Sequence, residues 1–306
     1  MGRNIKYQLK TAVESNFTPG AKKHSIKKSL GTDNTRSYSY ADRKNLIDFT
    51  ANFSNWLKEA HNEIKLVKDI KSSHVQEFLN SKAKECSYAT VKQYMSKANK
   101  MQNIINKTYG CNNKLNIEIP KSLSSKQVLR DQQMSVKDYE NIHSVMKIGG
   151  NGYKALEIGR NFGLRVSEIV KLQKRDIDIK KNEIRVIDAK GGRDRTVRLM
   201  TEDQVRVAKS LYNSVERDLD RIVPVRANSI NMALNRAMDK LDIKNDYKET
   251  SFHSIRKLYA QEEYNRLREN GCNIKEACEK VSEQLGHSSE RGNDKELISR
   301  YIKDIV

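Results

Sequence analysis

Six side chains in the C-terminal half of the sequence are of types that can act together on a phosphate group. They are two arginines, one lysine, two histidines and one tyrosine: Arg165, Lys190, His253, Arg256, His287 and Tyr301. The guanidinium of arginine stays protonated and forms bidentate, charge-assisted hydrogen bonds to phosphate oxygens. Within the set, His253 and Arg256 stand three residues apart, which puts both on one face of a helix. A chain that neutralises a phosphate with its own cations needs residues of this kind.

Each residue taken alone also has an ordinary structural interpretation. Arg165, within Gly-Leu-Arg-Val-Ser-Glu-Ile, fits an exposed arginine at the start of an amphipathic helix. Lys190 fits a solvated lysine in a turn, and the histidine–arginine pair fits polar groups on a helix surface. His287 after a glycine fits a cation at a helix C-terminus, where it interacts with the helix dipole. Tyr301 fits an amphipathic anchor that packs the last helix.

Several sequence motifs of other enzyme classes are missing from the chain. The sequence contains no GxxxxGK[ST] phosphate loop, no GxGxxG after a strand, no HExxH, and no Cys/His spacing typical of zinc. We therefore expect a reaction that uses no metal and no cofactor.

The order Arg165, Lys190, His253-x-x-Arg256, His287, Tyr301 resembles the motif of the tyrosine recombinases, the phage-integrase and Xer-type enzymes. The resemblance covers residues 131–306 by order of elements. The helical region at about 40–108 is similar to the core-binding domain of the family in helix content and position only. The resemblance implies a site-specific recombinase, of the integrase or excisionase type, that serves a mobile element.

The resemblance also implies how the scissile phosphate is bound. Arg165, Arg256 and His287 would hold its non-bridging oxygens and stabilise the charge of the transition state. Glu168 resembles the acidic residue that often supports the first arginine of the motif. Its implied role is to hold Arg165 rather than to touch the substrate.

The same resemblance implies the steps of strand cleavage. Tyr301 would attack phosphorus and form a 3′-phosphotyrosyl bond. Because a free phenol has a pKa near 10, it needs a base to take its proton, and His253 is the candidate. Lys190 would protonate the leaving 5′ oxygen. The covalent bond conserves the phosphodiester energy, so rejoining would need neither metal nor ATP.

Three features depart from the family pattern. Residues 288–296 form a longer and more charged segment than usual between His287 and Tyr301, and we expect a flexible insertion that delays docking of Tyr301 until DNA and a neighbouring protomer are present. An extra helical piece is expected around 270–280. Only residues 302–306 follow Tyr301, so contact between subunits would use the Tyr301 helix itself or other surfaces.

The elements that must position these residues are mostly helical. In residues 131–306, hydrophobic periodicity predicts helices at about 136–146, 152–161, 166–173, 202–217, 229–240, 252–268, 274–284 and 294–304. Ser135, followed by Asp138, is typical of a helix N-cap. Residues 183–187 and 195–199 alternate polar with apolar side chains, which predicts a β-hairpin with Lys190 near its tip.

The N-terminal part predicts a small, basic helical domain. Helices fit about 40–60, 73–84 and 87–108, with Ser87 as the expected N-cap of the third. Phe49, Phe53, Trp56 and Leu57 form a stripe that we interpret as core. Residues 1–36 fit either a flexible arm or a short first helix. The expected organisation is a basic segment 1–36, a helical DNA-binding domain 37–109, a basic linker 110–130 and a catalytic domain 131–306.

The expected fold class is therefore mainly α. A SAM-like helical core-binding domain precedes a mostly helical tyrosine-recombinase catalytic domain with a small antiparallel sheet.

The charge of the chain favours a polyanionic partner. The formal net charge is +19; residues 1–130 carry 24 Lys and Arg against 10 Asp and Glu, and residues 131–306 carry 34 against 29. Lys and Arg placed on phosphates release condensed counterions, so such a surplus favours nucleic acid. A solubilising, ribosome-bound or membrane-surface role is the alternative. The candidate DNA-binding residues lie in the third helix and the linker: Lys92, Lys97, Lys100, Lys121, Lys126 and Arg130.

The remaining composition indicates a cytoplasmic protein with no membrane partner, and the resemblance implies that it is nucleoid-associated. Its four cysteines form no CxxC pair, and no run of about 18 apolar residues occurs. The implied partners are double-stranded DNA with inverted-repeat sites, further copies of the chain in a dimer and a synaptic tetramer, and a directionality factor.

Three other functions stay open: a DNA-binding protein on a decayed recombinase scaffold, a type IB topoisomerase, and a metal-dependent nuclease that uses Asp176 and Asp178. We interpret that Asp pair as a solvated strand edge.

Overall fold

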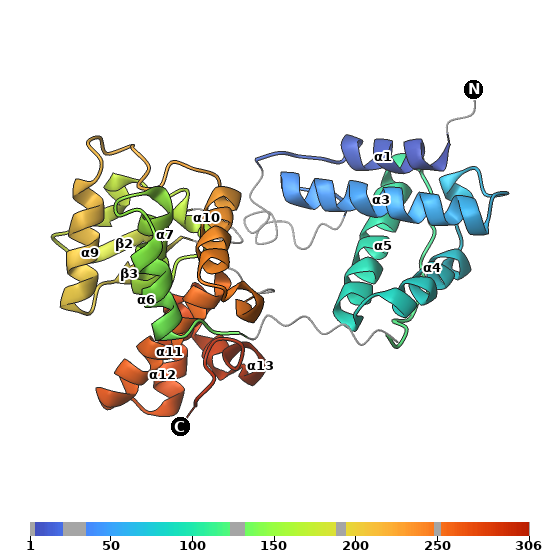
Figure 1. The fold of residues 1–306 in the computed structure, drawn as a ribbon. Coiled ribbons are helices and arrows are strands. Elements are labelled where there is room, and N and C mark those ends of the chain that lie inside the picture. Colours follow the sequence, from blue (N-terminus) through green and yellow to red (C-terminus); the bar gives the residue numbers. More distant parts are fainter. Residues whose placement is uncertain (1–3, 21–34, 123–131, 188–193, 248–251, 306) are drawn as a thin grey trace. The chain divides into compact units, whose positions relative to one another are not determined.

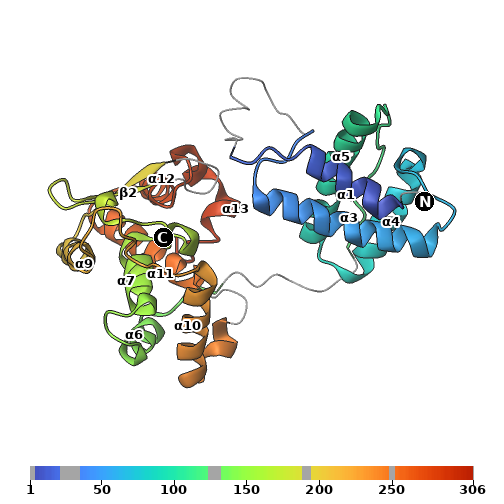
Figure 2. The ribbon, with the colours of Figure 1, turned by 90° about the horizontal axis from the view of Figure 1, so that it is seen from above.

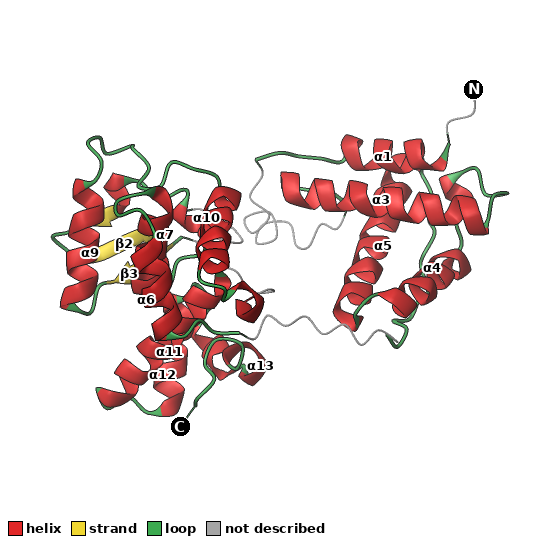
Figure 3. Cartoon of the chain, in the orientation of Figure 1, coloured by secondary structure: helices red, strands yellow, loops and turns green. Residues whose placement is uncertain are grey.

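The computed structural model describes residues 4–20, 35–122, 132–187, 194–247 and 252–305. The described chain is mostly helical with one small sheet (Figure 3), so the expected fold class is confirmed. It divides into two compact units, Met1–Val128 and Leu129–Val306.

In the described part of the N-terminal unit the regular elements are all helices, beside one isolated β-bridge between Phe17 and Ser37. Its elements are α1 (Ile5–Ser15), α3 (Tyr40–Ala60), the 3-10 helix η1 (Val67–Asp69), α4 (Ser72–Glu85) and α5 (Tyr88–Tyr109). The first residues contain the short helix that the sequence left open: α1 packs beside α3 (Figures 1 and 2) and buries Leu9, Ala12 and Val13. Arg43 of α3 donates to both carboxylate oxygens of Glu14, at 2.6 and 2.5 Å, and ties the two helices together.

An aromatic cluster forms the centre of this unit. The ring centroids of Phe53 and Phe78 lie 5.2 Å apart, and those of Phe49 and Phe78 lie 6.1 Å apart, both edge to face. Phe49, Phe53 and Leu57 are buried and Trp56 packs against them. The interpretation of this stripe as core is confirmed. Edge-to-face pairs stabilise the unit beyond the apolar area that the rings bury.

Residues 111–122 have no regular secondary structure, yet they pack along the same unit. Leu115, Ile117 and Ile119 contact its core. The backbone N–H of Glu118 donates to Gln76 Oε1 at 2.8 Å, which fixes the segment to α4. This half of the expected linker is therefore held by the helical unit.

The C-terminal unit contains one sheet and many helices. Its elements are α6 (Val136–Val145), α7 (Asn151–Phe162), α8 (Val166–Ile169), η2 (Lys174–Asp176), β1 (Ile177–Asp178), β2 (Glu183–Val186), β3 (Arg195–Arg198), α9 (Glu202–Asn213), α10 (Ala227–Lys240), η3 (Lys244–Tyr247), α11 (His253–Glu269), α12 (Ile274–Gln284), η4 (Ser289–Asn293) and α13 (Lys295–Ile298). Ser135 caps α6 as predicted, since its hydroxyl accepts from the N–H of Asp138.

The sheet has the order β1-β2-β3, and both pairings are antiparallel. Ile184 of β2 pairs with Val197 of β3 and with Ile177 of β1, so one face of the sheet is apolar and buried. The sequence predicted the hairpin but not β1. The interpretation of Asp176 and Asp178 as a solvated strand edge is wrong for Asp176, which is 5% exposed. Its carboxylate accepts from the N–H of Gln173 and closes the turn before β1.

Helix α11 lies between two hydrophobic clusters of this unit. Its Ile255 and Leu258 contact the cluster that contains α7 and the sheet, whereas Tyr259 and Tyr264 belong to the cluster formed with α12 and α13. Figure 1 shows α11 and α12 in adjacent positions. Because α11 is buried on most of its circumference, the polar residues at its N-terminus are held by both clusters.

Three predicted helices are shorter in the structure, and the one expected over 202–217 ends at Asn213. The helix expected over 166–173 ends at Ile169, after which η2 and β1 follow. The helix expected over 294–304 ends at Ile298, and Tyr301 lies in the turn beyond it. Tyr301 and Ile302 are both buried in the same cluster.

The turn between α7 and α8 depends on Gly163, whose φ is +61°. An ideal Cβ there would lie 2.3 Å from Cδ1 of the buried Tyr259 ring. We expect Gly163→Ala to lower the free energy of unfolding by about 3 kcal/mol, from left-handed backbone strain plus overpacking. Gly149→Ala is the control: its φ is +72° but nothing lies within 4 Å of the added Cβ, so only about 1 kcal/mol should be lost. Equal losses in urea titrations of the two variants would contradict this account.

Candidate active site

Five of the predicted site residues converge in the C-terminal unit. Arg165, Glu168, Arg256, His287 and Tyr301 are linked by contacts of 4.0 Å or less or by ring packing. They come from α8, α11, the turn after α12 and the turn after α13. His253 joins them through its ring. Lys190 lies outside the described residues.

Arg165 is held at the N-terminal end of α8 by Glu168. The backbone N–H of Arg165 donates to Glu168 Oε2 at 2.9 Å, and its Nη1 donates to Glu168 Oε1 at 2.8 Å. Its Nη2 lies 3.5 Å from His287 Nε2. The side chain is 17% exposed, so it is positioned by a buried partner yet reachable from outside.

Glu168 is a buried carboxylate among three guanidinium groups. Arg195 donates to both of its oxygens, Arg165 donates to Oε1, and Arg256 Nη1 lies 4.0 Å from Oε2. Burial by itself would raise the pKa of this carboxyl. The hydrogen bonds and attraction of Arg195, with smaller contributions from Arg165 and Arg256, outweigh burial and lower its pKa to about 2. Glu168 is therefore an anion at neutral pH.

Arg256 is fully enclosed by the fold. Its Nη1 donates to the carbonyl of Gly163 and its Nη2 to the carbonyl of Leu285, while its Nε has no hydrogen-bond partner among the described residues. Burial, and then repulsion by Arg165, lowers its pKa to about 10. The group stays protonated at neutral pH. A buried cation with an unused N–H is suited to an anionic ligand.

The hydroxyl of Tyr301 points into this cluster. It lies 3.4 Å from His287 Nε2, and Arg256 Cζ lies 5.8 Å from the centre of the Tyr301 ring. The His253 ring meets the Tyr301 ring edge to face with centroids 5.4 Å apart. The phenol ring itself is buried with Leu285 among its neighbours in the cluster of α11, α12 and α13. The fold therefore fixes the ring beside His253 and Arg256 and leaves its hydroxyl next to His287.

The segment between His287 and Tyr301 is packed, so the expectation of a flexible insertion that delays docking is wrong. Its η4 lies against α12, and Gly292 is so close that an added Cβ would lie 2.4 Å from Cα of Glu279. Asn293 donates to Glu279 Oε1 at 2.8 Å. Asp294 then caps α13 through the N–H of Leu297. These contacts bring Tyr301 to the site within its own chain.

The residues after Tyr301 are also bound to the same chain. Ile302 is 1% exposed in the cluster of α11 and α12. The backbone N–H groups of Lys303 and Asp304 donate to Gln261 Oε1, at 2.8 and 3.3 Å. The tail therefore holds the Tyr301 turn from its C-terminal side.

Arg195 is the member of the cluster that we did not predict. Its side chain is 10% exposed and donates to Glu168 Oε1 and Oε2 at 3.0 and 2.8 Å. A signal was present in the alternation of β3: Arg195 is in phase with the buried Val197 rather than with Thr196 and Arg198. Residues i and i+2 of a strand share a face, so an arginine in phase with core residues needs a buried partner.

The candidate DNA-binding lysines are not equivalent. Lys92 and Lys121 are exposed. Lys97 Nζ lies 5.7 Å from the centre of the Tyr94 ring. Lys100 Nζ lies 2.6 Å from Asp42 and its side chain is largely buried, so its charge is compensated within the chain. Lys126 and Arg130 lie outside the described residues.

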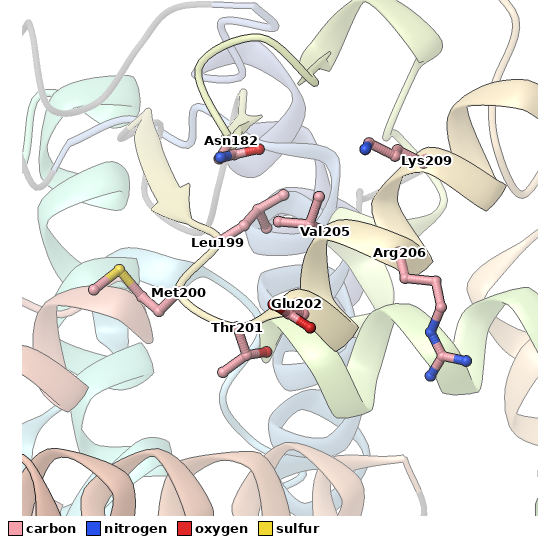
Figure 4. A pocket seen from close by; sticks show the side chains of 8 residues that line it. All are labelled: Asn182, Leu199, Met200, Thr201, Glu202, Val205, Arg206 and Lys209. Carbon is pink, nitrogen blue, oxygen red and sulfur yellow. The ribbon is translucent and has the colours of Figure 1, made fainter.

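Other features of the described residues lie apart from this cluster. A surface pocket of about 550 Å³ lies between the start of α9 and the turn at Asn182, and none of its lining residues belongs to the cluster (Figure 4). Within the described ranges, no group of three or more His, Cys, Asp or Glu side chains is placed to hold a metal ion. Every helix there is too short or too polar to cross a bilayer.

The ionisation of Glu168 should make stability depend on pH. Its pKa of about 2 in the folded chain is below the ordinary value of 4.5, so the charged form favours folding by on the order of 3 kcal/mol. That contribution is complete above about pH 4.5 and is lost as the pH falls toward 2. Unfolding free energies of wild type and Glu168→Gln, measured from pH 7 to pH 3, should differ most at pH 7. Glu183→Gln, which removes a loose pair with Arg198, is the control; a constant difference for Glu168→Gln would contradict the assignment.

Comparisons with known proteins identify the family. The sequence model of the phage integrase family matches residues 132–301, more than half of the chain. No curated protein sequence matches significantly. Among solved structures, a lambda integrase dimer bound to a COC' core site is 17% identical, with 90% of this chain and 91% of that chain covered and a TM-score of 0.58. XerH site-specific recombinase bound to palindromic difH substrate is 16% identical, with 95% and 90% covered and a TM-score of 0.61.

The Tn1549 transposon integrase in complex with transposon right end DNA is 15% identical, with 95% and 94% covered and a TM-score of 0.57. At such identities the structures show a common fold. The family match spans the segment that carries Arg165, Arg256, His287 and Tyr301 and ends at Tyr301. The chain therefore belongs to the phage integrase family and is a tyrosine recombinase.

Proposed function

We propose that this protein is a site-specific DNA recombinase that cuts and rejoins double-stranded DNA through a 3′-phosphotyrosyl bond to Tyr301. One observation carries the proposal. The Tyr301 hydroxyl lies 3.4 Å from His287 Nε2, which lies 3.5 Å from Arg165 Nη2, beside the enclosed cation Arg256. A phenol oxygen next to preorganised cations is the arrangement that attack on a phosphodiester requires.

In the proposed reaction Arg165, Arg256 and His287 bind the non-bridging oxygens of the scissile phosphate. The unused Nε of Arg256 and the exposed edge of Arg165 supply donors for them. Arg165 and Arg256 act most strongly on the additional charge of the pentacoordinate transition state, because they are already oriented by Glu168 and by main-chain carbonyls. Glu168 keeps Arg165 in place and does not touch the substrate.

The bond changes are balanced within the site. The Tyr301 oxygen bonds to phosphorus while the bond from phosphorus to the 5′ oxygen breaks. His253, whose ring meets that of Tyr301, takes the phenol proton, and Lys190 gives a proton to the leaving 5′ oxygen. In rejoining, a 5′ hydroxyl of another strand attacks and the Tyr301–phosphorus bond breaks. One phosphodiester is exchanged for another, so no energy source is consumed.

The proposed partners are DNA and further copies of the chain. Structures of similar fold include the lambda integrase dimer on a core site and a lambda integrase tetramer bound to a Holliday junction, which is 16% identical with a TM-score of 0.59. They support two protomers on an inverted-repeat site and a synaptic tetramer that exchanges strands through a Holliday junction. The transposon integrase among the similar structures supports integration or excision of a mobile element, for which a directionality factor would set the outcome.

The proposed DNA contacts of the N-terminal unit follow from its charge. Residues 1–130 hold most of the positive excess of the chain. Of the candidate residues, Lys92 and Lys121 are exposed and available to phosphates, and Lys97, Lys126 and Arg130 are proposed beside them. Lys100 is the weakest of these candidates, because Asp42 already compensates its charge.

The decisive experiment traps the covalent intermediate. Nicked duplexes that tile the DNA flanking the gene are incubated with the full chain, and adducts that resist SDS are isolated and sequenced at the nick. We expect one or a few sites, with the adduct unaffected by EDTA. Absence of any adduct would favour a DNA-binding protein on a decayed scaffold. Relaxation of supercoiled plasmid without regard to sequence would favour a type IB topoisomerase, and EDTA-sensitive cleavage without an adduct would favour a nuclease.

A further inference from the structure

Arg195 is a buried guanidinium to which the proposed reaction gives no task. It stands at the first position of β3, five residues after Lys190 in the sequence. Its two Nη atoms donate to the two oxygens of Glu168, and its Nε donates to the main-chain carbonyl of Gln284 at 3.2 Å. All three nitrogens of the fork are thus engaged with groups that lead to the active site.

On one side, Arg195 completes the hydrogen bonding of Glu168. Each carboxylate oxygen of Glu168 accepts one bond from Arg195 and one from Arg165. Two ionised oxygens offer about four acceptor sites, so these bonds fill them. The plane of the carboxylate is then set by the Arg195 fork, and Arg165 binds the edge that remains. Nη2 of Arg165 is left facing His287 rather than Glu168.

On the other side, Arg195 packs against the turn that carries His287. The Gln284 carbonyl that accepts from its Nε ends α12, and Gly286 lies directly against the guanidinium. An ideal Cβ on Gly286 would lie 2.9 Å from Nη1 and 3.0 Å from Cδ of Arg195, and φ at this glycine is +72°. The close approach therefore requires glycine, and one planar group contacts both halves of the phosphate-binding site.

We propose that Arg195 is a positioning residue: its guanidinium, clamped to both Glu168 oxygens and to the Gln284 carbonyl, holds Arg165 and His287 at the separation that one phosphate bridges. The inference rests on the proposed function. A lysine cannot replace the arginine, because an ammonium is a point charge that cannot match both carboxylate oxygens and a carbonyl in one plane. Arg195 acts through Arg165 and His287 and does not touch the DNA.

The test compares Arg195→Met with a matched control, Arg198→Met. Both remove a guanidinium from β3, but Arg198 is exposed and pairs only loosely with Glu183, at 3.8 Å. On the nicked duplex that traps the wild type, Arg195→Met should lower the single-turnover rate constant of adduct formation about a hundredfold, as a misplacement near 1 Å does. The final amount of adduct and the affinity for the duplex should stay near wild type. Arg198→Met should react at the wild-type rate.

A purely structural role would give a different pattern. If the substitution only unfolded part of the protein, the amount of adduct would fall while the rate constant of the folded fraction stayed unchanged, and the proposal would be overturned. Arg195→Lys should remain clearly slower than wild type; a wild-type rate would show that charge alone suffices and would also overturn it. Failure of the wild type itself to form an adduct would instead count against the proposed function.

A second variant displaces the same Arg195 guanidinium, so the test does not depend on Arg195→Met alone. Gly286→Ala should push the Arg195 guanidinium from its place and slow adduct formation in the same way. If both act through Arg195, the double variant Gly286→Ala/Arg195→Met should be no slower than the slower single variant, because sites that share one mechanism are not additive. Rate losses that multiply in the double variant would mean that Gly286→Ala acts on His287 independently of Arg195. That result would contradict the proposed positioning role of Arg195.

Discussion

The Tyr301→Phe variant should bind DNA with near wild-type affinity and yield no covalent complex. The substitution removes only the hydroxyl oxygen, the atom that would bond to phosphorus. The ring keeps its place in the buried cluster formed by α11, α12 and α13. Because the variant lacks the attacking atom, the loss of adduct should be complete rather than partial. Gel separation in SDS after incubation with a nicked duplex measures the adduct, and a filter or anisotropy assay measures binding.

Tyr264→Phe is the matched control for this variant. Tyr264 is a buried tyrosine of the same hydrophobic cluster, so its substitution also deletes one phenol oxygen from that part of the fold. It should still form the adduct. An adduct that persists in Tyr301→Phe would refute the assignment of the nucleophile. Loss of the adduct in both variants would point to damage of the cluster instead.

Arg256→Ala should slow cleavage by at least the roughly hundredfold typical of losing one preorganised transition-state donor. Arg256 is the most enclosed cation of the site, and it already sits between the carbonyls of Gly163 and Leu285 on the two sides of the cluster. Its removal takes away positive charge where repulsion between phosphate and phenolate is greatest. It also leaves two carbonyls without their donor, so stability should fall as well. Arg165→Ala should lose cleavage to a similar degree at a smaller cost in stability, because its side chain is partly exposed.

The control for Arg256→Ala is Arg268→Ala on the same helix. Arg268 also donates to a main-chain carbonyl, that of Cys272 at 2.8 Å. It takes no part in the contacts described above among the active-site residues. Single-turnover rate constants at a temperature well below the melting point of each variant separate chemistry from folding. A rate for Arg256→Ala near that of Arg268→Ala would remove Arg256 from the catalytic site.

Much of the fold was predictable because its causes are local. The helices at 40–60, 73–84, 136–146 and 274–284 carry apolar residues at helical spacing, and the structure places helices there within about two residues. The hairpin followed from strict alternation in 183–187 and 195–199. The predictions failed where burial by distant parts of the chain decides the backbone. The expected helices at 166–173, 202–217 and 294–304 end early, and the segment 288–296 was wrongly expected to be flexible.

The sequence by itself determined the chemistry that is possible: which side chains are cationic, imidazole or phenolic, and in what order they follow. It could also place His253 and Arg256 on one helix face, because three residues of a helix nearly complete a turn. Those properties belong to single residues or to neighbours along the chain, so they survive without knowledge of the fold.

Only the tertiary structure decided which charges meet. Whether Glu168 is shared by three arginines, whether Arg195 faces the site and Arg198 the solvent, and whether Tyr301 reaches His287 all depend on contacts between residues far apart in sequence. Such contacts form when α11 is buried between two clusters and when the segment before Tyr301 packs on α12. Burial of apolar surface is non-directional and roughly proportional to area. The position of each polar group therefore follows from how the whole unit closes its core.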